Sequence, residues 1–192
     1  MDTVRFLIED YVDEEQGFRF PTINIYINGR NLIALVEQIE QRNQILRGWE
    51  PSRSSYIGFE PRRNCCDEFL GLHRWPRSVL LTCTCTFEEC DCIMAKVTID
   101  SQTVRWDEIG SPWLDGATPS PWVDGIEALD AGWVPFDYSG LGPFIFDREQ
   151  YMNALDTLTE DMANFKSRLS NETDRYSGFY YKFDPRDIDS PN

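Results

Sequence analysis

The sequence predicts an α+β fold, in which an N-terminal helix and a long C-terminal helix pack on an antiparallel β-meander. Two observations predict this class. Short apolar segments alternate with polar residues between turn residues, and two longer segments repeat their apolar residues at helical spacing. The chain has 192 residues, of which 41% are hydrophobic and 14% aromatic, and this is enough for one core. We therefore expect a single domain over residues 1–192.

The first part of the chain predicts one strand followed by one helix. Isoleucines alternate with polar residues at positions 23–27, and Asn28-Gly29 predicts the tight turn that ends the strand. Asn31 is a favourable N-cap for the helix that follows, whose apolar stripe begins at Leu32 and ends near Gly48. A shorter apolar run closer to the amino terminus shows no clear period.

Residues 49–77 are rich in proline, arginine and serine, which predicts mostly loop with a short strand at positions 56–59. The vicinal pair Cys65-Cys66 lies in this segment, close to His73, the only histidine of the sequence. As a set these side chains suit metal ligation, but adjacent cysteines point in different directions in most backbone conformations. We therefore expect one buried and one exposed thiol in a loop.

The second half of the chain predicts a further hairpin and the C-terminal helix. Segments rich in β-branched residues flank Asp100-Ser101, which predicts a hairpin and extends the meander. Asp147 and Gln150 have the spacing of a capping box, and apolar residues at helical spacing follow at positions 151–169. Residues 170–192 form a polar tail with several aromatic residues, and we expect part of this tail to dock on the domain.

Four of the six cysteines fall within ten residues, in a segment whose alternation predicts a β-hairpin that reverses at Phe87-Glu88. They are Cys83, Cys85, Cys90 and Cys92. This reversal makes two cross-strand pairs, residues 83 with 92 and 85 with 90. Because side chains on a strand repeat every second residue, all four thiols would lie on one face.

Three interpretations of this cysteine hairpin remain open. The thiols suit one tetrahedral zinc, which needs Zn–S distances of about 2.3 Å. The same pairs suit cross-strand disulfides or redox chemistry, although a reducing compartment disfavours stable disulfides. They also suit a core, because free cysteine is commonly buried as a small apolar residue. Acidic residues in the loop would raise the thiol pKa values, which argues against a catalytic nucleophile. We expect either no cofactor or one zinc.

The charge of the chain excludes some partners. Thirty-three Asp and Glu face 18 Lys and Arg, and the net charge of -15 would repel a phosphate backbone, so we expect no direct nucleic-acid binding. No apolar stretch approaches the roughly 20 residues that span a bilayer, and the amino terminus lacks the pattern of a signal peptide. We therefore expect a cytoplasmic protein without membrane contact. An acidic surface keeps a protein soluble and also suits a basic protein partner.

Tryptophans mark the segment that follows the predicted meander. Trp113, Trp122 and Trp133 lie among prolines and glycines. Tryptophans in such a segment either pin it to the core or mark an interface. They are our candidate partner-binding residues.

We find none of the sequence signatures of catalysis. There is no nucleophile paired with a base in a known frame and no phosphate-binding glycine loop. The segment Gly140-Leu141-Gly142-Pro143 predicts a turn, because no Lys-Ser or Lys-Thr follows it. An enzyme is therefore the less favoured class.

Several separated patches of the chain resemble a family of uncharacterised bacterial proteins with a C-x-C-x4-C hairpin and a Y-x-G-L-G-P-F-x-F-D-R motif. The patches are Ile27-Asn28-Gly29, Leu80-Leu81-x-Cys83-x-Cys85-x4-Cys90, Val104-x-Trp106, Tyr138-Ser139-Gly140-Leu141-Gly142-Pro143-Phe144 and Phe146-Asp147-Arg148-x-Gln150-Tyr151. The resemblance implies a bacterial source and no reaction. Its pattern has three cysteines, so Cys92 is an addition in this chain.

These observations predict a noncatalytic, acidic protein-binding module of the immunity or inhibitor type. The alternative is a structural zinc-binding or thiol redox module. The first interpretation depends on the charge and the tryptophans, and the second depends on the cysteine hairpin.

Overall fold

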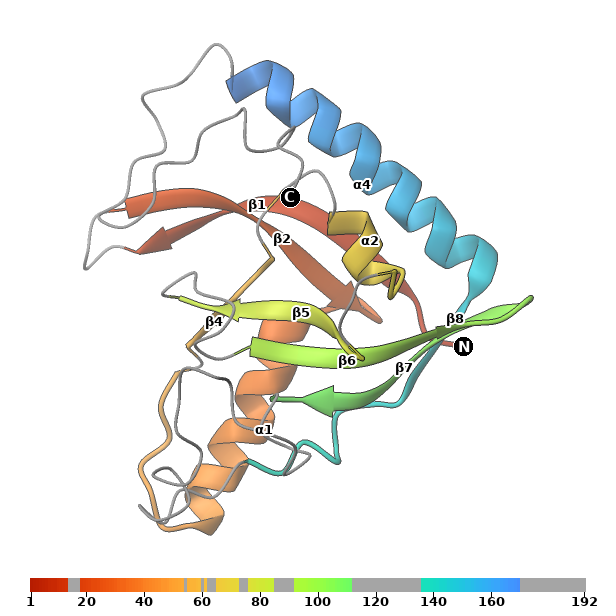
Figure 1. Ribbon diagram of the computed structural model, residues 1–192. Coiled ribbons are helices and arrows are strands. Elements are labelled where there is room, and N and C mark those ends of the chain that lie inside the picture. The colour runs from red at the N-terminus through yellow and green to blue at the C-terminus, as the bar shows by residue number, and fades with distance from the viewer. Residues whose placement is uncertain are drawn as a thin grey trace.

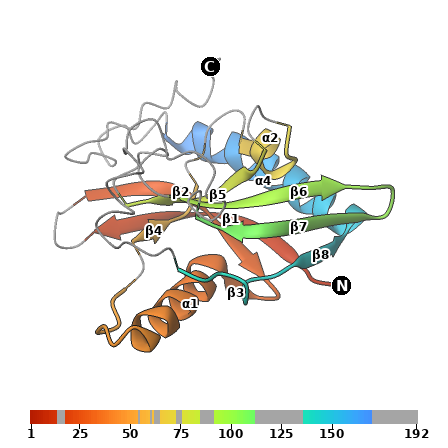
Figure 2. The ribbon, with the colours of Figure 1, turned by 60° about the horizontal axis from the view of Figure 1, so that its bottom comes forward.

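The computed structural model describes residues 1–13, 18–53, 55–59, 61, 65–72, 76–84, 92–111 and 136–169. These ranges form a curled antiparallel sheet with helices packed on it, as Figures 1 and 2 show. The predicted α+β class is confirmed, with one helix near the N-terminus and a long helix at the end of the described chain. In the described ranges no helix is both long and apolar enough to cross a bilayer.

The first part of the sheet is a long hairpin. β1 (Val4–Asp13) pairs antiparallel with β2 (Phe18–Ile27), and the end of β2 pairs with the short β3 (Arg30–Asn31). The isoleucines of β2 are buried as predicted. The sequence did not predict β1. Val4 and Phe6 alternate on the buried face, but the apolar Leu7 interrupts this alternation.

The second part is a meander in chain order. It consists of β4 (Tyr56–Ile57), β5 (Ser78–Cys83), β6 (Cys92–Ile99), β7 (Thr103–Gly110) and β8 (Phe144–Asp147). The predicted hairpin at Asp100-Ser101 joins β6 to β7. In its turn the Asp100 carboxylate accepts hydrogen bonds from the backbone N–H groups of Gln102 and Thr103, which hold the pKa of Asp100 below its usual range.

Two single bridges join the hairpin to the meander at both sides. Asp2 pairs with Phe146, and its N–H donates to Ile145 O (2.7 Å). At the other side Ile23 and Phe59 exchange two backbone hydrogen bonds (2.6 and 3.0 Å). Gly58 permits this approach, because a Cβ at that position would lie 2.5 Å from Ile23 O. The sheet therefore curls round on itself and encloses the core.

Three described helices pack on this sheet: α1 (Leu32–Leu46), α2 (Cys65–Phe69) and α4 (Arg148–Leu169). Both predicted N-cap bonds are present, but the Gln150 side chain of the predicted capping box binds the backbone of Val4. The Asn31 side chain accepts from Ile33 N (2.8 Å), and Asp147 Oδ1 accepts from Gln150 N (2.9 Å). α2 was wrongly predicted as loop, since its five residues are too few to show a helical period.

An aromatic cluster ties α4 and α2 to the sheet. Trp106, Tyr151, Phe6, Phe69 and Phe146 are all at most 2% exposed. The Tyr151 hydroxyl accepts from Trp106 Nε1 (3.2 Å) and donates to Phe69 O (2.5 Å). One buried hydroxyl thereby links α4, β7 and α2, and burial raises the pKa of Tyr151 far above its ordinary value.

Candidate functional site

The cysteine hairpin differs from its prediction in register. Thr82 lies opposite Cys92, and a bulge between Val79 and Leu81 interrupts the pairing of β5 with β6. The predicted pairing of Cys83 with Cys92 is therefore wrong. Adjacent residues of a strand face opposite sides, so this register separates the two thiols onto different faces of the sheet.

The zinc hypothesis stays a prediction, because Cys85 and Cys90 lie outside the described residues. Cys92 is buried and Cys83 half-buried at the two ends that lead into this segment. Within the described ranges no three His, Cys, Asp or Glu side chains form a group that could hold a metal ion.

The candidate partner-binding residues Trp113, Trp122 and Trp133 also lie outside the described residues, as do His73 and the predicted tail at 170–192. Their predicted roles therefore stay predictions. A turn at residues 138–141, closed by the Leu141 N–H donating to Tyr138 O (2.8 Å), precedes β8 and overlaps the turn predicted at 140–143.

The vicinal cysteines lie at the start of α2, where the sequence predicts a loop. Cys65 is fully buried, with its Sγ 3.1 Å from Met162 Sδ. Cys66 is half-exposed, with its Sγ 3.5 Å from Thr159 Oγ1. The predicted buried thiol is confirmed, whereas the thiol predicted to be exposed is only half-exposed. The Cys65 side chain and Thr159 stabilise the Cys66 thiolate and lower the pKa of Cys66 to about 7, whereas the pKa of Cys65 is raised.

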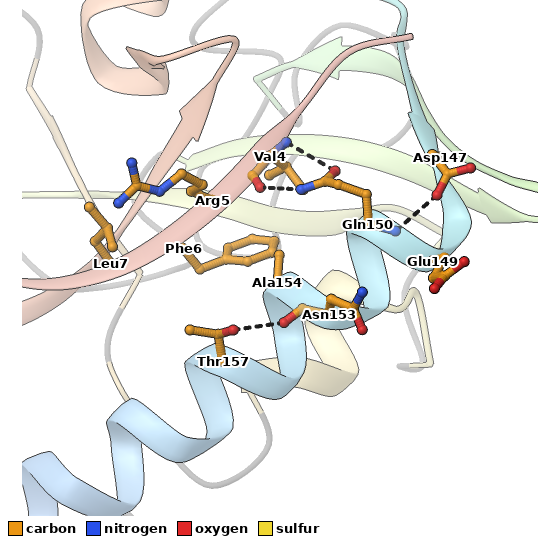
Figure 3. Close-up of a pocket in the computed structure, with 10 residues that line it drawn as sticks. All are labelled: Val4, Arg5, Phe6, Leu7, Asp147, Glu149, Gln150, Asn153, Ala154 and Thr157. Carbon is orange, nitrogen blue, oxygen red and sulfur yellow. Dashed lines mark hydrogen bonds between the residues drawn. The ribbon is translucent and has the colours of Figure 1, made fainter.

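A groove of about 510 Å³ opens between β1 and the first turns of α4 (Figure 3). Its β1 wall consists of four consecutive residues, Val4, Arg5, Phe6 and Leu7. Val4 and Phe6 are at most 2% exposed, whereas Arg5 is exposed and Leu7 half-buried. Arg5 and Leu7 therefore supply most of the accessible surface of this wall.

The opposite wall is one face of α4. Gln150, Asn153, Ala154 and Thr157 recur at helical spacing along it, and Asp147 and Glu149 stand at its N-terminal end. Asn153 and Thr157 are exposed, and Ala154 is half-buried. This wall is polar and has no large apolar side chain.

Gln150 closes one end of the groove through the backbone of β1. Its Nε2 donates to Val4 O (2.8 Å), and its Oε1 accepts from Val4 N (3.4 Å), as Figure 3 shows. The side-chain amide thus makes the two hydrogen bonds that a neighbouring strand would make. Val4 and Gln150 are 146 positions apart, so no local pattern in the sequence indicates the groove.

A second hollow, of about 340 Å³, lies between β7 and the turn before β8. Arg77 is 6% exposed there and donates to Glu108 O (3.3 Å) and Ser111 O (3.5 Å). The carboxylates at its rim are engaged: Asp107 binds Arg105, and Glu108 binds Lys96. Arg77 therefore holds the irregular end of β7 and gives this hollow a structural role.

The groove beside β1 is the stronger candidate for binding. Its polar groups are side-chain amides, the Thr157 hydroxyl, which donates to Asn153 O (2.8 Å), and the charged groups of Arg5, Asp147 and Glu149. The amides and the hydroxyl suit recognition of a peptide, and the carboxylates suit basic side chains. No protein-family model, curated protein or solved structure matches the chain, so the site rests on its own geometry.

Proposed function

We propose that the chain is a noncatalytic protein-binding module that binds a basic protein partner. The observation that carries this proposal is the groove between β1 and α4, which has the acidic side chains of Asp147 and Glu149 in its lining. Glu160 and Asp161 follow at helical spacing from Thr157 on the same side of α4.

The charge of the whole chain supports a basic partner. At a net charge of -15 the protein attracts basic proteins and repels acidic ones over about one Debye length, which is roughly 8 Å at physiological salt. The basic residues near the groove are Arg5 and Arg148, fewer than the acidic ones. Electrostatic complementarity of this kind speeds association and selects partners.

In its specific form the proposal is a bacterial immunity or inhibitor protein that acts in the cytoplasm. A small acidic protein of this type would cover the functional surface of a basic enzyme, which needs binding and no chemistry. Neither the tryptophan segment nor a zinc ion is required for this role.

Cross-linking in cells of the source organism, followed by reconstitution of the pair from purified proteins, tests the proposal. We expect a basic partner and a dissociation constant that rises at least about tenfold between low and high salt. A reconstituted complex whose dissociation constant does not change with salt contradicts the proposal. The proposal is also contradicted if no cross-linked protein binds the purified chain.

A matched pair of variants locates the charge effect. Glu149→Gln with Glu160→Gln removes two charges beside the groove and should weaken the complex. Glu37→Gln with Glu50→Gln removes two charges from α1 and the segment after it, on the other side of the sheet (Figure 1), and should change affinity little. Equal effects of the two double variants contradict a specific acidic surface.

A thiol function is the second candidate, favoured by the environment of Cys66. Its pKa of about 7 makes a substantial fraction thiolate at neutral pH, and the side chain is half-exposed. We expect alkylation of Cys66 by iodoacetamide to rise with pH around that value, while the buried Cys65 stays unreactive in the folded protein. A Cys65→Ala variant removes the side chain that lowers the pKa most and should raise it, and unchanged reactivity there would contradict this assignment.

A further inference from the structure

We propose that the sulfur atoms of Cys65, Cys66 and Met162 form a binding site for one soft monovalent metal ion, Cu(I). This site goes beyond the reactivity of the Cys66 thiol and does not depend on a basic partner. Soft thiolate and thioether ligands favour soft metals such as Cu(I). Because one of the three ligands is a methionine, the set differs from the groups of His, Cys, Asp and Glu that hold harder metals.

Two helices bring the three sulfur atoms together. The start of α2 lies against α4, with Cys65 Sγ 3.1 Å from Met162 Sδ (Figure 1). The Cys66 Sγ contacts Thr159 Oγ1 (3.5 Å), and Thr159 lies one turn before Met162 on the same side of α4. The two thiols also interact with each other, because the Cys65 side chain is the largest cause of the lowered pKa of Cys66. Cys65 and Met162 are 97 positions apart, so the fold assembles this set and no local motif contains it.

The two cysteines are available to a metal because their positions do not suit a disulfide. Both are free, and both lie in the first turn of α2. A disulfide usually joins Cα atoms about 4.4–6.8 Å apart, whereas consecutive Cα atoms are only about 3.8 Å apart. The pair therefore stays in the dithiol form, which is the form that binds a metal ion.

Met162 can adjust to a bound ion. With metal–sulfur distances of about 2.3 Å, two ligands of a trigonal site lie about 4 Å apart. Cys65 Sγ and Met162 Sδ are 3.1 Å apart, so entry of the ion requires them to separate by about 1 Å. Methionine is unbranched and has three rotatable bonds, so the end of its side chain can move this far within the core. The two helices need not rearrange.

The surroundings favour a cation that enters from the exposed side. Cys66 is half-exposed, whereas Cys65 is 0% and Met162 8% exposed. A metal ion therefore meets Cys66 first and passes from it to the two buried sulfur atoms. The negative charges of Asp67 and Asp156 act on the Cys66 thiol. The same charges attract a cation and repel an anionic oxidant such as glutathione disulfide.

Binding changes the protonation of the ligands and no oxidation state. The Cys66 side chain and burial raise the pKa of Cys65, so without a metal its thiol keeps the proton. Cu(I) replaces that proton and the proton of Cys66, and both protons pass to water as two Cu–S bonds form. The Met162 thioether donates a lone pair and loses nothing. Burial of two of the three ligands limits the access of water and oxygen to the ion, which favours the reduced metal.

Competition with the chromogenic Cu(I) chelator bicinchoninate, without oxygen, tests the proposal on the full chain. The same titration on Cys85→Ser with Cys90→Ser removes two thiols of the cysteine hairpin, which could otherwise account for binding. We expect both proteins to withdraw one Cu(I) per chain from the chelator. X-ray absorption should show three sulfur ligands at about 2.3 Å, and bound Cu(I) should block alkylation of Cys66.

A matched pair of methionine variants on α4 locates the site. Met162→Leu removes the thioether, nearly keeps the volume, and should weaken Cu(I) binding at least about tenfold. Met152→Leu makes the same exchange at a half-buried position about 15 Å away along the helix axis and should leave the affinity unchanged. Cys66→Ser removes a half-exposed thiol and should weaken binding further than Met162→Leu does. Circular dichroism of each variant checks that the fold is retained.

Three results would overturn the inference. If no Cu(I) leaves the chelator, or if Met162→Leu and Met152→Leu bind equally well, the three sulfur atoms only pack in the core. If Cys85→Ser with Cys90→Ser abolishes binding, the cysteine hairpin holds the copper instead. If X-ray absorption shows two sulfur ligands, Met162 is not one of them. The partner complex and the pH dependence of Cys66 alkylation are measured separately, so they still decide the two proposed functions.

Discussion

The two long helices are held to the sheet by different kinds of contact. α4 buries one apolar residue in almost every turn, and these residues are Tyr151, Leu155, Leu158, Met162 and Phe165. α1 buries only Leu32, Val36 and the acidic Glu40, and its last apolar residues, Ile45 and Leu46, are 60% and 77% exposed. Apolar burial anchors α4 along its length, whereas the end of α1 depends on directional contacts.

Those directional contacts join α1 to the segment that precedes β8. The Tyr138 hydroxyl donates to Glu40 Oε1 (2.7 Å). The Asn43 amide donates to Asp137 O (3.0 Å) and accepts from Asp137 N (2.9 Å). The Arg47 guanidinium stacks over the ring of Phe136 (5.0 Å). Each contact fixes a position and contributes less free energy than a buried leucine, so α1 should open before α4 does.

Removing a buried side chain of α4 should have the largest effect. Leu158 is fully buried, and Leu158→Ala should lower the free energy of unfolding by about 2–5 kcal/mol through lost burial and a cavity. Ile45→Ala on α1 is the control, and the change at this exposed site should stay within about 0.5 kcal/mol. Urea denaturation measures both, and similar losses would contradict the difference between the helices.

Tyr151→Phe should have the next effect, because it keeps the ring and removes the hydroxyl. The buried Phe69 carbonyl and Trp106 N–H each lose their hydrogen bond to that hydroxyl, which should cost about 1–3 kcal/mol. Tyr26→Phe is a matched control, since the half-buried Tyr26 hydroxyl donates to Glu9 and water can replace it. A larger loss for Tyr26→Phe in thermal unfolding would contradict this account.

Tyr138→Phe should destabilise α1 and leave α4 unchanged. It removes a hydrogen bond to a buried carboxylate, a contact worth about 1.5–3 kcal/mol. Hydrogen exchange should accelerate in the second half of α1 and remain unchanged in α4. Uniform acceleration across both helices would show that α1 and α4 open as one unit.

Asn43→Ala should produce the smallest change, about 1 kcal/mol, because its bonds to Asp137 lie near the surface. Gln38→Ala on the same helix removes only an exposed bond from Arg30 and should have almost no effect. The comparison by urea denaturation shows how much one side-chain amide contributes to holding α1. Equal values would mean that Asn43 is dispensable.

Local patterns predicted the elements whose signals are contained within a few residues. Asn31 and Asp147 are caps that act on residues two and three positions away, so a single sequence is enough to find them. The isoleucines of β2 alternate without interruption, and the apolar stripe of α4 repeats over its whole length. Both helices were therefore predicted with nearly correct limits.

The candidate site depends on contacts that no local pattern contains. The groove exists because Gln150 reaches Val4 across the whole chain and because α4 departs from the line of β8. The register of the cysteine hairpin depends on a bulge within the fully apolar run Val79-Leu80-Leu81, where alternation gives no guide. Tertiary packing determines both the groove and this register, and the periodicity of the sequence predicts neither.

The distance in sequence between β1 and its cover has a consequence during synthesis of the chain. β1 and β2 are local partners and can pair as soon as both leave the ribosome, but Gln150 is made 123 residues after Ile27. At about 5–20 residues per second, the edge of β1 waits uncovered for roughly 6–25 seconds. An uncovered strand edge is a template for wrong pairing between chains. Residues 1–27 carry six acidic and two basic side chains, so neighbouring nascent chains repel each other at this edge before α4 exists.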